Sequence, residues 1–208
     1  MGKLRVVQYI NQFFAQVGGE DKADYPMEYH EGPMGPGLAF QQALGDQAEI
    51  IGTIVCGDSY FGENTDKVKP EILKKVAELK PDLFIAGPAF NAGRYGFACA
   101  TIAVAVQDEL HIPVVTGMYV ENPGADEAKS KVYIVSTKNS AAGMRDAVKK
   151  MAPLGLKIAR GEHIGSSAEE GYIPQGNRVN FFEEERGSKR AVKMLLAKIS
   201  GKPFTTEY

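Results

Sequence analysis

The sequence has 208 residues, of which 44% are hydrophobic and 24% are charged. This composition is typical of a globular protein with a substantial core. Its 24 basic and 26 acidic side chains give a net charge of -2, so we expect neither nucleic acid nor a membrane as a partner. The chain enters its first predicted strand without the apolar stretch of a secretory signal peptide, and no apolar run is long enough to span a membrane. This pattern predicts a cytoplasmic protein.

The first half of the chain alternates between strand and helix patterns. Runs rich in β-branched and aromatic residues predict strands at 4–10 and 49–56, and helical apolar spacing predicts helices at 36–44 and 66–79. Residues 25–37 contain three prolines and three glycines, which favours an irregular excursion before the first helix.

Residues 81–96 form the centre of the pattern. Leu83 to Ala86 predicts a buried central strand that Gly87 and Pro88 end, and a helical stripe begins at Gly93. Asn91, Arg94 and Tyr95 lie at that helix start, where free amides and a cation would suit a carboxylate or a phosphate. The alternative is a tight turn whose glycines serve geometry alone.

The second half predicts strands at 114–119 and 132–136 and a helix at 141–160, capped by Ser140 and kinked or divided at Pro153 and Gly155. A long surface segment is expected at 162–187 and a terminal helix at 188–200. The whole chain, 1–208, is predicted to be a single α/β domain. Its fold is expected to be doubly wound, with a mainly parallel five-stranded sheet, helices on both faces and the flavodoxin-like order 2-1-3-4-5.

Such a sheet would gather the polar residues that follow its strands along one edge. We therefore predict a small-molecule site from residues near the strand ends: Asn11, Asp58, Ser59, Asn91, Arg94, Tyr95, Glu121, Asn122, Asn139 and Ser140. The alternative for each asparagine is a turn-forming role. Arg94 is the candidate contact for a substrate carboxylate, with Asn91 as a second donor; alternatively, Arg94 pairs with Asp58 or Glu121 and joins two loops.

No catalytic residue can be assigned from the pattern. The glycine motifs of nucleotide-binding proteins are absent, and no histidine follows a strand to activate Cys56. Cys99 lies among apolar neighbours, and Asp58 with Glu121 is an alternative acid/base pair. The two cysteines and the three histidines, His30, His111 and His163, form no metal-ligand pattern, so we expect no metal and no cofactor in this chain.

Several longer motifs resemble one family. They are Tyr9-Ile-Asn-Gln-Phe-Phe14, Gly18-Gly-Glu20, Cys56-Gly-Asp-Ser-Tyr60, Ala86-Gly-Pro-Ala-Phe-Asn-Ala-Gly-Arg-Tyr-Gly96, Thr116-Gly-Met-Tyr119, Glu121-Asn-Pro-Gly124, Asn139-Ser-Ala-Ala-Gly-Met144, Glu183 to Val192 and Phe204 to Tyr208. Together they cover essentially the whole chain and resemble component B of the glycine, sarcosine and betaine reductases, an oxidoreductase family of anaerobic amino-acid fermentation.

The resemblance implies a reductive cleavage of a C–N bond, in which a selenocysteine attacks the substrate and a carboxymethyl group passes to the selenoprotein component A. The family's selenocysteine lies downstream of the matched part, so the chain looks like the amino-terminal portion of the selenoprotein subunit and is expected to be inactive alone. Expected partners are a small amino acid or betaine, the downstream half of component B, other component B subunits and component A, in an oligomer. The alternative is a non-catalytic binding or scaffold module; an independent cysteine enzyme lacks an activating base.

Overall fold

A computed structural model describes residues 2–176 and 183–206. Its contacts divide the chain into two units, 1–176 and 177–208. This division does not test the predicted single domain, which stays a prediction. The part of the predicted surface segment that falls on 177–182 lies outside the described residues.

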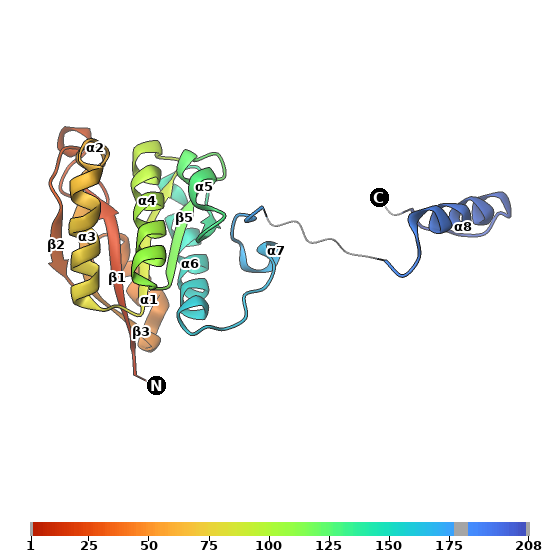
Figure 1. The fold of residues 1–208 in the computed structure, drawn as a ribbon, viewed down its shortest axis with the longest axis horizontal. Helices are drawn as coiled ribbons and strands as arrows, with labels where there is room; N and C mark the ends of the chain where they lie inside the picture. The colour runs from red at the N-terminus through yellow and green to blue at the C-terminus, as the bar shows by residue number, and fades with distance from the viewer. Residues whose placement is uncertain (1, 177–182, 207–208) are drawn as a thin grey trace. The chain divides into compact units, whose positions relative to one another are not determined.

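The first unit is a twisted sheet with helices on both faces (Figure 1). Its strands are β1 (Leu4–Asn11), β2 (Glu28–Glu31), β3 (Ala48–Cys56), β4 (Leu83–Phe90), β5 (Val114–Met118) and β6 (Tyr133–Ser136). Its α-helices are α1 (Pro36–Leu44), α2 (Asp58–Glu63), α3 (Thr65–Leu79), α4 (Gly93–Leu110), α5 (Pro123–Ala128), α6 (Met144–Ala159) and α7 (Ser167–Glu170), and short 3-10 turns are η1 (Glu20–Lys22), η2 (Gly45–Gln47) and η3 (Ala141–Gly143).

The sheet has six strands in the order β2-β3-β1-β4-β5-β6. The prediction of five strands was wrong, because β2 adds an antiparallel edge strand beside β3. The other strands are all parallel, and their spatial sequence β3-β1-β4-β5-β6 follows the predicted order of the parallel set. Their carboxyl ends therefore lie along one edge of the sheet, as a site at that edge requires.

Two apolar layers hold the helices to the sheet. On one face, α2, α3, α4 and α5 pack against strand residues such as Tyr9, Cys56 and Phe84. On the other face, α1 and α6 pack against residues such as Val6 and Leu83. The parallel strands contribute alternate residues to the two layers, as a parallel sheet covered on both faces should.

Strand β4 is longer than the sequence predicted. The Gly87–Pro88 peptide is cis and lies where the β4–β5 register shifts between Ala86 and Phe90, after which Phe90 pairs with Met118. A bulge accommodates a proline that has no amide hydrogen to donate, so pairing resumes beyond it. The loop that carries Asn91 therefore starts four residues later than expected, after Phe90 rather than after Ala86, and Arg94 already lies in α4.

Helix α6 continues through Pro153 and Gly155, so it is not divided there; the kink, which was the other predicted outcome, stays a prediction. Two short helices follow strand ends for which no helix was predicted: α2 begins two residues after Cys56, and α5 begins directly after Asn122. Among the described residues, no helix combines the length and apolar character needed to cross a bilayer.

In the second unit, α8 (Gly187–Ile199) corresponds to the predicted terminal helix. One apolar stripe on this helix is exposed, with Val192, Leu195, Leu196 and Ile199 all more than half accessible. Such a stripe makes α8 an amphipathic helix.

Candidate functional site

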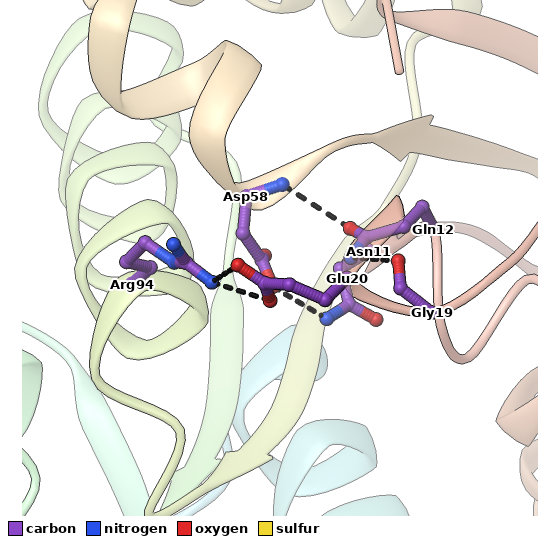
Figure 2. A network of polar contacts seen from close by, with 6 residues as sticks. All are labelled: Asn11, Gln12, Gly19, Glu20, Asp58 and Arg94. Carbon is purple, nitrogen blue, oxygen red and sulfur yellow. Dashed lines mark hydrogen bonds and ion pairs between the residues drawn. The ribbon is translucent and has the colours of Figure 1, made fainter. Parts of the chain in front are cut away.

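The candidate site is a polar network at the carboxyl edge of β1 and β3, beside the start of α4 (Figure 2). Asn11 is the last residue of β1, Asp58 is the first residue of α2, and Arg94 lies in the first turn of α4. Parallel topology brings these three positions together although they are far apart in sequence.

Asn11 donates a hydrogen bond to the Asp58 carboxylate. Its Nδ2 donates to Asp58 Oδ2 at 2.9 Å, while its own Oδ1 accepts from the Phe14 amide at 3.0 Å. The Asp58 amide donates to Gln12 Oε1 at 3.1 Å, and Gln12 Nε2 donates to the Gly19 carbonyl at 3.4 Å. The loop after β1 is thus tied to the start of α2 by side-chain amides, which fixes the position of Asp58.

Asp58 is a buried carboxylate with unused bonding capacity. Only 9% of the residue is exposed, and its Oδ1 has no hydrogen-bond partner among the described residues. Burial raises the pKa of its carboxyl; Asn11 and Arg94 oppose that rise, and Glu20 adds to it. A buried acceptor without a partner is unusual in folded proteins, and among the described residues Oδ1 shares this state with other buried side-chain atoms, including the hydroxyls of Tyr9 and Tyr95.

Arg94 makes an ion pair with Glu20, from the short turn η1 after β1. Its Nη2 lies 2.5 Å from Glu20 Oε1 and 2.6 Å from Oε2. The pair is exposed, with 56% of the Arg94 side chain and 74% of the Glu20 side chain accessible. The sequence had suggested Asp58 or Glu121 as the alternative partner of Arg94, and this part was wrong because η1 brings Glu20 closer.

A pocket of about 380 Å³ adjoins the network. Its wall includes Asp58, Ser59 and Arg94 from the predicted site, together with Gly62, Glu63, Gly93 and Phe97. It therefore presents carboxylates, a guanidinium and an aromatic ring to one small space, the combination that a small charged ligand needs.

The remaining predicted residues lie apart from this network or inside the fold. Tyr95 is fully buried, with its ring centroid 6.5 Å from that of Tyr9 and 5.7 Å from that of Phe14. Burial raises its pKa well above the ordinary tyrosine value. The side chains of Asn91, Glu121, Asn139 and Ser140 are exposed and make no hydrogen bond or ion pair to any described residue.

Asn122 is fully buried, and its amide is occupied by the backbone. Its Nδ2 donates to the carbonyls of Phe90 at 2.9 Å and Ala92 at 3.2 Å, and its Oδ1 caps α5 by accepting from Gly124 at 3.0 Å. It joins the end of β4 to the start of α5. A substrate contact by Asn122 stays a prediction and would require some of these bonds to break.

Neither cysteine is poised as a nucleophile. Burial raises the pKa of the Cys56 thiol to about 12, with Asp58 and Glu71 adding to the effect. Cys99 is completely buried, and its pKa is raised for the same reason. Both side chains therefore stay protonated thiols inside the core at neutral pH.

Two site residues were missed by sequence reasoning. Gln12 and Glu20 belong to the polar, glycine-containing loop after β1 and were not among the predicted site residues. A turn of this composition does not reveal which side chain will reach a residue 74 positions later in the chain. Gln12 and Glu20 could have been marked as candidates by their position at or after the end of a strand, which they share with Asn11 and Asp58.

Comparison with known proteins assigns this sequence to a family. The family model described as glycine/sarcosine/betaine reductase selenoprotein B matches residues 3–208. The glycine reductase complex component B subunit gamma of Peptoclostridium litorale is 58% identical, over 100% of this chain and 48% of the relative. The sarcosine reductase complex component B subunit beta of Peptoclostridium acidaminophilum is 55% identical, again over 100% and 48%.

A more distant relative, the betaine reductase complex component B subunit beta of Peptoclostridium acidaminophilum, is 43% identical over 98% of this chain and 47% of its own length. The chain thus spans about half the length of the curated relatives it matches. No solved structure matches it. Since the family model covers nearly every residue and the relatives agree with it, the chain belongs to the glycine/sarcosine/betaine reductase selenoprotein B family.

Proposed function

We propose that the chain is the amino-terminal part of the substrate-specific component B of a glycine, sarcosine or betaine reductase, and that it binds the substrate and docks the other parts of the complex. The relatives that match it carry the names of glycine, sarcosine and betaine reductase component B subunits. The observation that carries the substrate-binding part is the meeting of Arg94 and Asp58 on one pocket of about 380 Å³ at the carboxyl edge of the parallel strands.

In this proposal the nucleophile comes from outside the 208 residues. The sequence contains no selenocysteine, and its two thiols are buried and protonated. The reductive C–N cleavage, with transfer of the carboxymethyl group to the selenoprotein component A, then takes place where the downstream half of component B meets the bound substrate. This chain supplies binding and orientation rather than the attacking atom.

Arg94 is the residue on which the proposal depends most. A guanidinium can hold a carboxylate through two parallel hydrogen bonds, and the exposed Arg94 has only its Nη2 engaged by Glu20. In the complete component B, Arg94→Ala should weaken substrate binding about tenfold to a hundredfold, the effect of one lost charge-assisted contact. Arg94→Lys should fall between, because lysine keeps the charge and loses the planar fork.

Calorimetric titration with glycine, sarcosine and betaine measures this effect. Arg160→Ala is the matched control, since Arg160 also pairs with a nearby carboxylate, Glu162, and donates to Gln47. A non-catalytic scaffold is the competing function. It predicts saturable binding of none of the three ligands. If Arg94→Ala lowered the melting temperature while affinity stayed within twofold of wild type, Arg94 would be a structural residue outside the site.

A further inference from the structure

A groove runs between α1 and α6, on the face of the sheet opposite to α4. Two adjoining hollows of about 670 Å³ each form it, and both are lined by Ala39 of α1 and Met144 of α6. One hollow continues to Phe13, in the loop after β1, and the other continues along α6 to Val148. The groove therefore begins at the carboxyl edge of the sheet and follows the two helices away from it.

Large apolar side chains border the groove and remain open to solvent. Phe13 is 58% exposed and Leu38 of α1 is 59% exposed. A single exposed apolar side chain needs no explanation, but these two lie beside one concave surface that Met34 and Met144 also line. Phenylalanine and methionine are enriched where proteins bind one another, so this surface has the composition of a protein interface.

The walls of the groove are held in place without an occupant. A Cβ added at Gly35, which has a φ of 50°, would lie 2.1 Å from the Phe14 carbonyl oxygen, so the start of α1 lies against the backbone of the loop after β1. In that loop the Ala15 amide donates to the Asn11 carbonyl at 3.0 Å, and the Phe14 ring lies 6.0 Å from the Phe90 ring, centroid to centroid. A preformed surface of this kind loses little conformational entropy on binding.

The charge along the groove has one sign. Arg145 and Lys149 lie one turn apart on α6, are exposed, and make no hydrogen bond or ion pair to any described residue. The neighbouring carboxylate, Asp146, is paired with Lys150 at 2.9 Å. Within the described part of the chain, no carboxylate lines either hollow. An occupant that carries carboxylates would gain two partners here, and one that carries lysines would be repelled.

The shape of the groove suits a helix. Ala39 and Ala43, one turn apart on α1, have short side chains that leave room between α1 and α6. The nine residues of α1 extend for about 13 Å, enough to contact two turns of a partner helix through an apolar stripe. A flat membrane surface cannot enter a hollow between two helices. The stripe of α8 from a second copy has the wrong charge, because α8 contains four basic residues and no acidic one.

We propose that the groove between α1 and α6 docks an acidic amphipathic helix from a polypeptide segment outside residues 1–208. Apolar side chains of that helix fill the space beside Phe13, Leu38 and Met144, and its carboxylates pair with Arg145 and Lys149. The inference rests on the docking part of the proposed function and names its surface. Because Phe13 and Phe14 belong to the same loop as Asn11 and Gln12, the docked helix contacts the loop that positions Asp58.

Photocrosslinking in the complete reductase complex identifies the occupant. The exposed Gln42, which lines the groove, is replaced by p-benzoylphenylalanine, and the cross-linked peptide is identified by mass spectrometry. We expect a helical peptide from outside residues 1–208 with aspartate or glutamate beside an apolar stripe. The same replacement at Lys74, which is exposed on α3 on the opposite face, is the control and should not give that peptide.

A designed peptide tests the chemistry of the groove directly. The probe is a labelled, stapled helix with leucines at helical spacing and glutamates beside them, and a matched peptide has lysines in place of the glutamates. Fluorescence anisotropy with the 208-residue chain should show the glutamate peptide binding at least about tenfold more tightly than the lysine peptide. Arg145→Glu should narrow that difference, and Leu38→Gln should weaken the glutamate peptide about tenfold. Lys74→Glu makes the same charge change on α3 and should alter the affinity little.

Equal binding of the two peptides, or unchanged affinity in folded Leu38→Gln and Arg145→Glu variants, would overturn the proposal. A cross-link from position 42 to a second copy of residues 1–208, or to a segment without acidic residues, would also overturn it. No cross-link from position 42 in an assembled complex would mean that docking uses another surface, and the docking function would stand. Failure of the complex to assemble with this chain would overturn both, while substrate binding is decided separately by the calorimetric titration.

Discussion

The buried carboxyl of Asp58 weakens the fold at neutral pH. Burial raises its pKa in the folded state, and the hydrogen bond from Asn11 and the charge of Arg94 only partly oppose this. A carboxyl with a raised folded-state pKa stabilises the fold fully below its unfolded pKa, and that contribution is lost as pH rises through the folded pKa. At neutral pH, folding must therefore bury a charge that water would hold better.

Asp58→Asn is therefore expected to raise the melting temperature at pH 7. Asparagine keeps an acceptor for Asn11 and carries no charge to bury. The gain should shrink as pH falls toward about 4, the ordinary pKa of aspartate, because wild-type Asp58 then becomes neutral too. Thermal melts at both pH values measure this, with Asp66→Asn, at an exposed carboxylate in the first turn of α3, as a control that changes little, and a lower melting temperature at pH 7 would contradict the prediction.

Residue-level reasoning from sequence could reach Asn11, Asp58 and Arg94, because each follows a strong strand signal at a predictable edge. It could not separate Asn122 from them. Asn122 follows β5 in the same way, yet its amide is consumed by the carbonyls of Phe90 and Ala92 and by the α5 cap. Whether a strand-end asparagine faces a ligand or the backbone depends on neighbouring loops that the local sequence does not describe.

At the scale of elements, α4 and α5 approach each other closely because Gly96 has no side chain. A Cβ added at Gly96 would lie 2.0 Å from Asn122 Oδ1, and a Cβ added at Gly124 would lie 2.4 Å from the Gly96 carbonyl oxygen. At this point the backbone of α4 therefore lies directly against the backbone of α5, and the Asn122 side-chain amide packs against Gly96. This packing sets where the first turn of α4, with Arg94, lies against the end of β5.

Gly96→Ala should destabilise the protein by roughly 1–3 kcal/mol, the usual effect of overpacking a close contact. Gly93→Ala, one turn earlier in the same helix, meets nothing within 4 Å and serves as the matched control. Urea denaturation of both variants measures the free energy of unfolding. Equal stability of the two would mean that the α4–α5 contact relaxes without strain.

The helices and strands could be predicted from sequence where their apolar residues form a strong pattern. The parallel strands are runs of β-branched and apolar residues, and α3 and α8 carry clear helical stripes. Strand β2 was missed because Glu28-Tyr-His-Glu31 is mostly polar and only its pairing with β3 makes it a strand. Helices α2 and α5 were missed because each has only six residues. With a glycine and several polar side chains among them, these segments show no helical period of apolar residues.

At the scale of the whole molecule, the apolar surface of α8 predicts association. Val192, Leu195, Leu196 and Ile199 recur at helical spacing and are more than half exposed. We expect the chain to self-associate as its concentration rises, and Leu196→Gln to shift the equilibrium toward monomer. Lys198→Gln on the same helix is the control, and analytical ultracentrifugation showing a monomer at all concentrations would contradict the expectation.

The two edges of the sheet limit how another chain can join the first unit. Along β6, the Ser136 amide donates to the Gly171 carbonyl at 2.9 Å and the Ile173 amide donates to the Ile134 carbonyl at 2.7 Å, so the backbone there is already paired. The opposite edge, β2, is four residues long and carries charged Glu28 and Glu31. Short, charged or covered edges resist the addition of a strand. A partner subunit is therefore expected to bind through side chains on helices and loops, so that its affinity will respond to surface substitutions and little to the backbone of either edge.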